Sequence, residues 1–152
     1  VEKCAACTAL GADRAIDYKT EDFGAIVKAE TGGKGVDVIL DMVGGDYVMR
    51  NLNALARGGR MVNIAYQKGA KVEVDFRIVQ ARLLTMAATG LRGRPDSEKA
   101  LIRDHLAKEV WPLFGQGKLK PVTHKVFPLA EADAAHGLMK ESSHIGKILL
   151  EP

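Results

Sequence analysis

Two cysteines are the first residues of this chain whose type and spacing could do chemistry. Cys4 and Cys7 form a C-x-x-C motif, but structural zinc needs four ligands, and no second cysteine pair or nearby histidine follows. A redox C-x-x-C opens a helix directly after a strand, whereas these cysteines lie inside EKCAACTALGA, which predicts a helix with no strand before it. We therefore predict no metal or redox site, and two small buried thiols in a reducing cytosol.

The densest basic stretch comprises Arg77, Arg82, Arg92, Arg94 and Arg103. Two interpretations stay open: solvated surface, or contact with an anionic ligand near Arg92 and Arg94. No aromatic residues interleave with these arginines as a base-stacking platform would require, so we expect no nucleic-acid partner. No apolar run approaches the ~20 residues of a membrane span, so we expect no membrane partner either.

Motifs for other chemistries are absent from the sequence. We find no Ser-His-Asp set, no carboxylate pair at catalytic spacing, and no Cys-His pair within one loop. Neither G-x-G-x-x-G nor G-x-x-x-x-G-K-[ST] occurs, which excludes a P-loop protein. The catalytic residues of any enzyme built from this chain are therefore unknown at this point.

The composition is that of a globular domain. The chain has 152 residues, of which 47% are hydrophobic, and a net charge of +3. A domain of this size buries roughly two-thirds of its unfolded surface. Disordered, collagenous and disulfide-rich classes are excluded. The chain begins at Val1 without a signal-peptide pattern or an initiator Met, which indicates a portion of a longer protein.

Apolar runs and helical patterns alternate along the chain. Strands are predicted at Arg14–Tyr18 (RAIDY), Val36–Val43, Arg60–Ala65, Leu83–Thr89, Val122–Phe127 and Lys147–Leu150. Helices are predicted at Lys3–Leu10, Glu21–Glu30 with Thr20 as its cap, Asp46–Ala56, Phe76–Ala81, Ala130–Met139, and from a cap at Asp96 to a kink or end at Pro112. A turn is predicted at 57–59.

Alternating strands and helices predict an α/β fold, with a parallel sheet and helices on both faces. Ligands of such sheets bind at the carboxyl ends of the strands. The positions to examine are therefore Tyr18, residues 41–45, residues 65–68 and residues 89–94.

Four segments carry a resemblance to a known family: LGADRAIDYKTEDF, GGKGVDVILDMVGGDY, LARGGRMVNIAY and FPLAEADAAHGLMKESSHIGKILL. Together they resemble the C-terminal part of the medium-chain dehydrogenase/reductase superfamily, and most closely its zinc-free quinone oxidoreductases. The resemblance implies a Rossmann-like sheet that is incomplete, because the first strand and the glycine-rich loop would lie upstream. It divides the chain into a partial nucleotide-binding domain, 1–120, and a return segment toward the catalytic domain, 121–152.

The same resemblance implies a cytoplasmic, NADPH-dependent oxidoreductase without catalytic zinc. In that family, hydride passes from NADPH to a quinone or a related electron-poor carbonyl or enone. Residues that orient the substrate carbonyl lie mostly in the upstream domain, so we expect the fragment alone to be inactive. The alternative is a non-catalytic nucleotide-binding or dimerisation module, which would fit the missing phosphate loop.

Two residues resemble the family's contacts to the phosphate end of the cofactor. Lys3 matches the lysine that lies against the 2′-phosphate of NADPH, and Tyr18 matches a tyrosine at the adenosine phosphate end. A lysine here supplies a positive charge to a phosphate, where NAD-binding proteins place an acidic residue. Alternatively, Lys3 is an exposed lysine at a helix start and Tyr18 a half-buried tyrosine at a strand end.

Further cofactor contacts are implied at the strand ends. Val43 and Gly44 match the turn that passes under the cofactor, where small residues let the backbone approach closely. Ile64, Ala65 and Tyr66 match the segment that lines the nicotinamide side, although the family often has glycine at the position of Ala65. A tight strand-to-helix turn alone would also explain Gly44.

The segment after the fourth predicted strand and the closing motif complete the resemblance. Leu91 and Arg92 match positions that face the cofactor cleft, and Arg92 either pairs with substrate or phosphate or stays in solvent. His144 lies in the closing motif and is interpreted as a surface histidine.

Without its first two strands, the sheet would contain no strand that normally pairs with RAIDY. We expect either a rearranged sheet, with RAIDY beside VDVILDMV, or pairing between chains at an open strand edge. Family members also commonly dimerise through the strand that matches Leu83–Thr89, so we expect a homodimer there.

Overall fold

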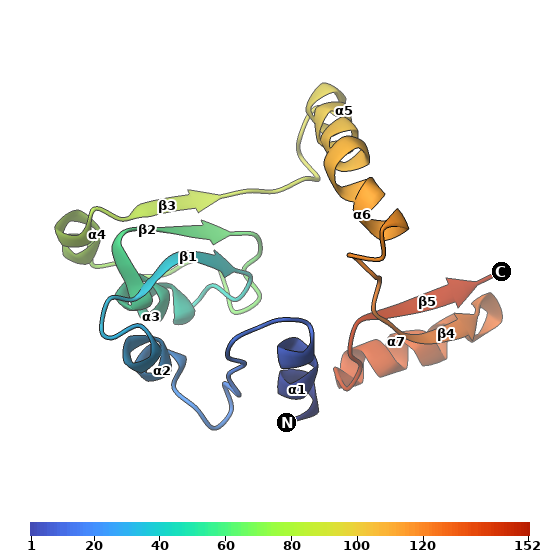
Figure 1. Ribbon diagram of the computed structural model, residues 1–152, viewed down its shortest axis with the longest axis horizontal. Coiled ribbons are helices and arrows are strands. Elements are labelled where there is room, and N and C mark those ends of the chain that lie inside the picture. Colours follow the sequence, from blue (N-terminus) through green and yellow to red (C-terminus); the bar gives the residue numbers. More distant parts are fainter. The chain divides into compact units, whose positions relative to one another are not determined.

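The computed structural model describes residues 1–152 (Figure 1). The chain divides into two compact units, of which one is Ile16–Arg94 and the other combines Val1–Ala15 with Pro95–Pro152. Each unit contains its own parallel sheet. The predicted division of the chain into 1–120 and 121–152 stays a prediction.

The unit Ile16–Arg94 alternates helices and strands. Its elements are α2 (Phe23–Glu30), β1 (Val36–Asp41), α3 (Tyr47–Ala54), β2 (Leu55–Asn63), α4 (Phe76–Arg82) and β3 (Thr85–Ala88). The strands pair in parallel in the order β1-β2-β3, so each strand lies beside the next one along the chain. This arrangement confirms the predicted α/β fold with a parallel sheet and flanking helices. The predicted cover of both faces is not found within this unit, because Val38 and Leu40 on one face of β1 are exposed.

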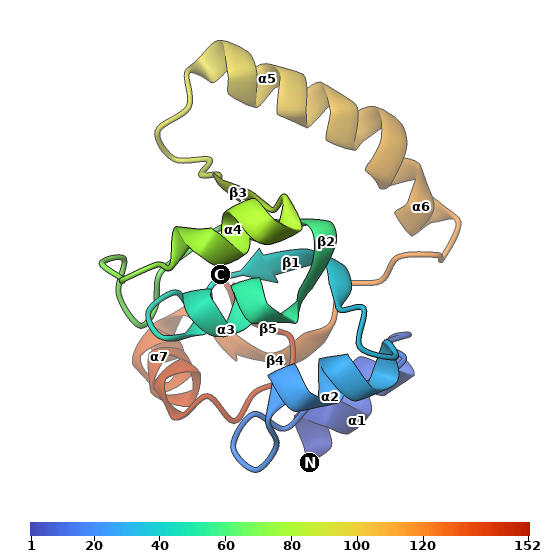
Figure 2. The same ribbon diagram turned by 90° about the vertical axis from the view of Figure 1, so that its left-hand side faces the viewer.

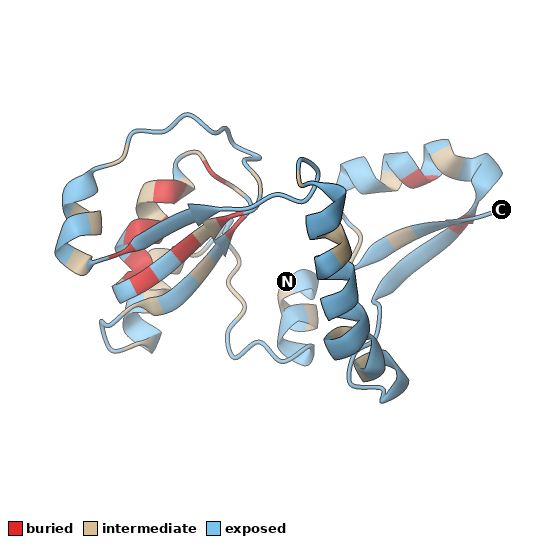
Figure 3. Cartoon of the chain, turned by 90° about the horizontal axis from the view of Figure 1, so that it is seen from above, coloured by how far each residue is buried: buried red, intermediate tan, exposed pale blue.

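The core of this unit lies between the sheet and the helices α3 and α4. Leu52, Leu55 and Met61 are completely buried there, and Ile39 packs against them. Figure 2 shows α3 and α4 in front of the strands, and the buried residues that Figure 3 colours red lie in this unit mainly on α3 and β2. Because successive strand side chains alternate between faces, Leu40 belongs to the opposite face, where 63% of its surface is exposed.

The segment Arg14–Tyr18 is not a strand, so the predicted strand and its predicted place beside VDVILDMV are wrong. Its polar groups hydrogen-bond locally instead. The Asp17 N–H donates to Glu21 Oε2 at 2.8 Å, and the Asp17 carbonyl accepts from the N–H groups of Thr20 and Glu21. Such local bonds compete with strand pairing, and no neighbouring strand offers this segment a ladder.

β2 begins five residues earlier than predicted, at Leu55 instead of Arg60, and the predicted turn at 57–59 lies inside it. The strand pairing accommodates that turn through a shift in register. Val36 pairs with Leu55, but Val38 already pairs with Arg60, so the extra residues of β2 form an irregularity between these two pairs. Gly58 adopts a positive φ of 75° within it, a conformation that glycine takes without steric cost.

α2 begins later than predicted, and its cap is Asp22 instead of Thr20. The Asp22 Oδ1 accepts a hydrogen bond from the Gly24 N–H at 3.0 Å and from Arg50 Nη2 at 3.1 Å. The bond from the Gly24 backbone, followed by that from Arg50, lowers the pKa of the Asp22 carboxyl below its usual value. The charged form is therefore favoured in the folded state.

We expect this cap to make the unit acid-sensitive. A carboxyl with a lowered pKa stabilises the fold fully above its unfolded pKa, near 3.8, and this stabilisation is lost as the pH falls through the folded value. Asp22→Ala should therefore lower the free energy of unfolding at neutral pH, and the difference should shrink below about pH 4. Asp46→Ala is the control, because Asp46 precedes α3 without a capping bond. Equal losses in urea denaturation would contradict the assignment of the cap.

The second unit combines the two ends of the chain. Its elements are α1 (Glu2–Ala9), α5 (Asp96–His105), η1 (Leu106–Val110), α6 (Trp111–Gly115), β4 (Thr123–Pro128), η2 (Leu129–Glu131), α7 (Ala132–Glu141) and β5 (Lys147–Glu151). β4 and β5 pair in parallel. The helix α7 contacts both strands, and its Ala135 is buried. None of the helices in the chain is long and apolar enough to cross a membrane.

The helical run of this unit does not end at Pro112; it changes geometry in the turn before the proline and continues to Gly115. α5 gives way to the π-helical turn η1, and α6 then begins with Trp111 and Pro112. Proline has no N–H to donate to the preceding turn, so it is tolerated in the first turn of α6. The predicted cap Asp96 is wrong by one residue, since Pro95 is the cap and Asp96 is already helical.

Candidate functional site

The loops after the three strands of the unit Ile16–Arg94 leave the sheet at one edge. Asp41 at the end of β1 pairs with Asn63 at the end of β2, and Asn63 pairs with Ala88 at the end of β3. The segments 42–45, 64–69 and 89–94 therefore all begin at the carboxyl edge, where parallel α/β sheets bind their ligands. We call these three segments the carboxyl-edge loops.

A buried pair of polar side chains organises this edge. Asn63 Nδ2 donates to Asp41 Oδ2 at 2.8 Å, and both residues are less than one-tenth exposed. The Asp41 carboxylate also accepts from the N–H of Val43 at 2.7 Å and from that of Gly44 at 3.2 Å. The carboxylate is thereby compensated by three donors, as a buried charge requires. It fixes the first turn of the loop after β1 and ties it to β2.

Glycines bring the first two carboxyl-edge loops into close contact. Gly44 and Gly45 both have positive φ angles. A Cβ added to Gly44 would lie 2.7 Å from the carbonyl oxygen of Gly69 and 3.1 Å from Tyr66 Cδ1. The Gly45 N–H donates to the same Gly69 carbonyl at 2.9 Å, and the Lys68 N–H donates to the Val43 carbonyl at 2.8 Å. These contacts hold the main chain of the two loops together.

Gly44→Ala should destabilise this edge through two separate effects. One is the positive φ, and the other is the collision with Gly69. Gly58→Ala provides the matched control, because Gly58 also has a positive φ but has open space around the position of a Cβ. We expect Gly44→Ala to cost about 1–2 kcal/mol more than Gly58→Ala in urea unfolding, as overpacking typically does. The same cost at both positions would show that the loops do not pack as described.

Exposed apolar side chains lie on the carboxyl-edge loops. Met42, Ile64, Tyr66 and Leu91 are between 41% and 58% exposed, and Arg92 follows as an exposed cation. Exposed apolar groups together with a few polar ones are typical of small-molecule sites.

Contacts join the predicted cofactor-binding residues of the first two loops, whereas Leu91 and Arg92 lie on the third loop. Gly44 lies against Tyr66, and the Val43 carbonyl binds the Lys68 N–H in the same loop as Tyr66. The Ile64 N–H donates to the Asp41 carbonyl at 2.8 Å. Half-buried Ala65 lies between Ile64 and Tyr66. The third loop, which carries the predicted residues Leu91 and Arg92, starts beside the second, because the Thr89 N–H donates to the Asn63 carbonyl at 3.0 Å.

Arg94 braces the third loop. Its Nε donates to the Gly90 carbonyl and one of its Nη atoms donates to Thr89 Oγ1, both at 3.0 Å. Arg92 has no such structural bond and is exposed, so it is the arginine of this loop that is available to a ligand.

The two residues predicted at the phosphate end lie outside these loops. Tyr18 is 69% exposed, in the turn that precedes α2. Lys3 belongs to the other compact unit, where its Nζ in α1 donates a hydrogen bond to the Ser142 carbonyl. Their roles toward a cofactor stay predictions.

Asn63 is the residue of this edge that the sequence reasoning missed. The available signal was that Asp41 and Asn63 each follow a run of apolar residues at the end of consecutive strands. In a parallel sheet, such positions fall side by side.

The cysteines and histidines form no metal centre. No group of three or more His, Cys, Asp and Glu side chains is placed to hold an ion. Cys4 and Cys7 are both free thiols, and Cys7 is exposed on the short helix α1, so the expectation that both thiols are buried is wrong. His144, predicted at the surface, is only partly exposed; its ring lies 6.4 Å from that of His124.

A parallel sheet whose carboxyl-edge loops are built from glycines and a buried Asp–Asn pair defines an α/β ligand-binding fold. The family model for zinc-binding dehydrogenases matches residues 10–150, and the chain belongs to this family. The family name by itself places no zinc in this chain.

Similar proteins and solved structures support this assignment. The chain is 34% identical to the 2-haloacrylate reductase of Burkholderia sp and 30% identical to quinone oxidoreductase 1 of Escherichia coli, over 99% of its own length in each case. It covers 45% and 46% of these proteins, so it spans a little under half of their length. A crystal structure of an NAD-dependent alcohol dehydrogenase superposes with a TM-score of 0.80 at 30% identity, over 99% of this chain and 41% of that one.

Proposed function

We propose that these residues are the C-terminal, nucleotide-binding part of a cytoplasmic oxidoreductase that uses NADPH to reduce a quinone or a related electron-poor carbonyl or enone. One observation carries the proposal. The predicted contact residues Val43, Gly44, Ile64 and Tyr66 meet at the carboxyl edge of the sheet, where dinucleotides bind in this class of fold.

The carboxyl-edge loops suit one part of such a cofactor. Gly44 and Gly45 leave no room for a Cβ, because Tyr66, Lys68 and Gly69 of the neighbouring loop fill that space. Having no side chains, the two glycines would also let a ribose approach their backbone closely. Ile64, Ala65 and Tyr66 would line the nicotinamide side. When it is bound, the reduced nicotinamide supplies the hydride.

Charged groups elsewhere would hold the phosphates. Arg92, from the third loop, would contact a phosphate or the substrate, while Lys3 and Tyr18 would contact the 2′-phosphate end. The glycine-rich loop that cradles the pyrophosphate in this fold is not part of the sequence, so these residues account for only part of the binding energy. We expect the 152-residue chain alone to bind NADPH weakly or not at all.

The electron acceptor is proposed from the chemistry that the relatives' names share. Quinones and 2-haloacrylates are both conjugated and electron-poor, so each can accept a hydride. The exposed apolar side chains Met42, Ile64 and Leu91 would exclude water beside such a flat acceptor. No residue of this chain is assigned a proton-transfer role.

Turnover by the complete gene product tests this proposal. We expect it to oxidise NADPH when benzoquinone is added. Arg92→Gln should lower kcat/KM by about tenfold, the effect of losing one charge-assisted hydrogen bond. Arg103→Gln is the matched control, because the Arg103 side chain lies on α5, outside the carboxyl-edge loops, and hydrogen-bonds to its neighbour Asp104. Equal effects of the two variants would remove Arg92 from the site.

A second candidate function is a module that binds a nucleotide or dimerises without turnover. The absence of G-x-G-x-x-G from the sequence favours it. If the gene encodes only these residues and its product binds a nucleotide without oxidising NADPH, this alternative replaces the enzyme.

We further propose that the protein forms a homodimer through Leu83–Thr89. β3 is the last strand in the order β1-β2-β3, so one of its edges has no partner strand, and an open edge favours pairing with another chain. Size-exclusion chromatography with light scattering should give the mass of a dimer, and Met86→Lys should shift it to a monomer. A monomeric wild type would contradict this interface.

A further inference from the structure

A cavity of about 370 Å³ lies in the unit Ile16–Arg94, away from the carboxyl-edge loops. Its lining residues come from α2, the turn that follows it, and the ends of α3 and α4, and they include Asp22, Lys28, Lys34, Gly35, Ala54 and Arg82. A volume of this size is within the range of small-molecule sites.

The cavity lies at the amino edge of the sheet. Gly35 directly precedes β1, Ala54 directly precedes β2, and Arg82 is the last residue of α4, shortly before β3. The strands are parallel, so their amino ends share the edge opposite to the carboxyl-edge loops. A ligand in this cavity would therefore be separate from a dinucleotide at the other edge.

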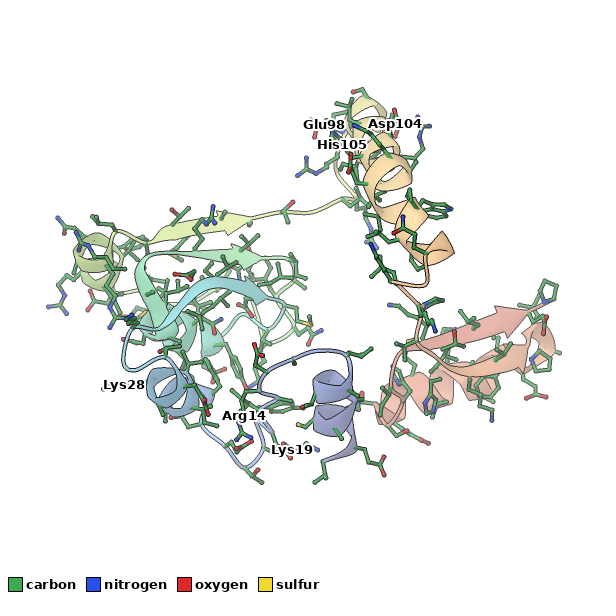
Figure 4. The ribbon with its side chains drawn as sticks, viewed as in Figure 1. Arg14, Lys19, Lys28, Glu98, Asp104 and His105 are labelled. Carbon is green, nitrogen blue, oxygen red and sulfur yellow. The ribbon has the colours of Figure 1, made fainter.

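The charge of the cavity is positive. Lys28, Lys34 and Arg82 contribute positive charges to the cavity. Its one lining carboxylate, that of Asp22, accepts hydrogen bonds from the Gly24 N–H and from Arg50. Neither lysine has an ion-pair partner in the structure. Figure 4 labels Lys28 on α2. The cavity thus holds cationic groups that no protein carboxylate neutralises.

Two of its walls are held in place by hydrogen bonds. Arg82 Nη1 donates to the carbonyls of Asn53 and Leu55, both at 2.9 Å. These bonds fix the guanidinium and leave its other N–H groups available to a ligand. In the turn after α2, the Gly35 N–H donates to Thr31 Oγ1 at 2.9 Å. A Cβ at Gly35 would lie 2.5 Å from the Ala54 carbonyl oxygen, so the turn packs directly against the end of α3.

We propose that this cavity binds a small polyanion, such as a phosphorylated or multiply carboxylated metabolite with at least two negative charges. The lysine ammonium groups would neutralise the charge, and the fixed guanidinium of Arg82 would set the position of one anionic group. Ala25, Val27 and Ala54 supply the short apolar walls around it.

Isothermal titration of the complete gene product with pyrophosphate, at low ionic strength, tests this site. The wild type should bind pyrophosphate, and the double variant Lys28→Gln/Lys34→Gln should raise the dissociation constant at least tenfold. The control Lys19→Gln/Lys71→Gln removes the same net charge from lysines outside the cavity, and it should bind like the wild type. Circular dichroism and the unfolding midpoint confirm that the variants fold.

Saturating NADPH provides a second arm, because it should leave pyrophosphate binding unchanged if the two sites are separate. Three results would each overturn the proposal: no binding to the wild type, equal weakening by the two double variants, or displacement of pyrophosphate by NADPH. Failure of the oxidoreductase assignment would leave the comparison between the two double variants intact, so the two proposals can fail independently.

Discussion

Replacing Lys3 with glutamate in the complete gene product is expected to raise the KM for NADPH by about 100-fold while changing the KM for NADH by less than about threefold. The variant exchanges an attraction to the 2′-phosphate for a repulsion. A hydrogen bond to a charged group is worth about 1.5–3 kcal/mol, and about 2.7 kcal/mol corresponds to 100-fold. Initial rates with each cofactor, at a fixed quinone concentration, give the two constants.

A structural role of Lys3 would produce a different result. Its Nζ donates to the Ser142 carbonyl in the folded protein, so a purely structural lysine would affect both cofactors equally. Lys3→Arg should retain the preference for NADPH, because it keeps the charge. Lys19→Glu is the control for a general change in surface charge. Equal loss with NADPH and NADH in Lys3→Glu would remove the cofactor assignment.

Asp41→Ala is expected to lower the free energy of unfolding by about 3 kcal/mol. The substitution leaves the N–H groups of Val43 and Gly44 and the Asn63 amide without their acceptor, and each unsatisfied buried donor costs about 1–3 kcal/mol. The total is lower than the sum of the three free-energy costs, because the loop relaxes and lets water bind some of these donors. Urea denaturation followed by circular dichroism measures the difference.

Asp37→Ala is the matched control for this substitution. Asp37 lies in the same strand, β1, but it is exposed, so we expect a change within about 0.5 kcal/mol. Asn63→Ala should fall between the two, because it removes only one of the three donors to Asp41. Equal effects of Asp41→Ala and Asp37→Ala would mean that the buried network does not organise the carboxyl edge.

The sequence was sufficient to predict that the strands β1, β2 and β3 exist and at which edge their loops meet, but not where β2 begins. Nearly continuous runs of branched apolar residues, as in VDVILDMV, are typical of parallel strands, and this pattern is local, although Val38 and Leu40 on one face of β1 are exposed. The order of alternating elements then determines the parallel arrangement. The loop positions therefore followed without knowledge of any contact between residues distant in the sequence.

The errors arose where a distant partner or a competing local bond decides the structure. Arg14–Tyr18 has the composition of a strand, but a strand exists only with a neighbour, and Asp17 is bound within its own turn. Asp22, and not Thr20, caps α2 through the Gly24 N–H, and its carboxylate also binds Arg50 on α3, a partner distant in the sequence. The pairing of Asp41 with Asn63 depends on strand register, which the pattern of one strand does not contain.

The oxidation of NADPH by the complete gene product tests the central claim most directly. Absorbance of the reduced cofactor should fall when benzoquinone is added, and Arg92→Gln should slow the reaction more than Arg103→Gln. The isolated 152-residue chain should show neither turnover nor a micromolar dissociation constant for NADPH. A complete gene product that binds no NADPH and oxidises none, with quinones and enones both supplied, would contradict the account.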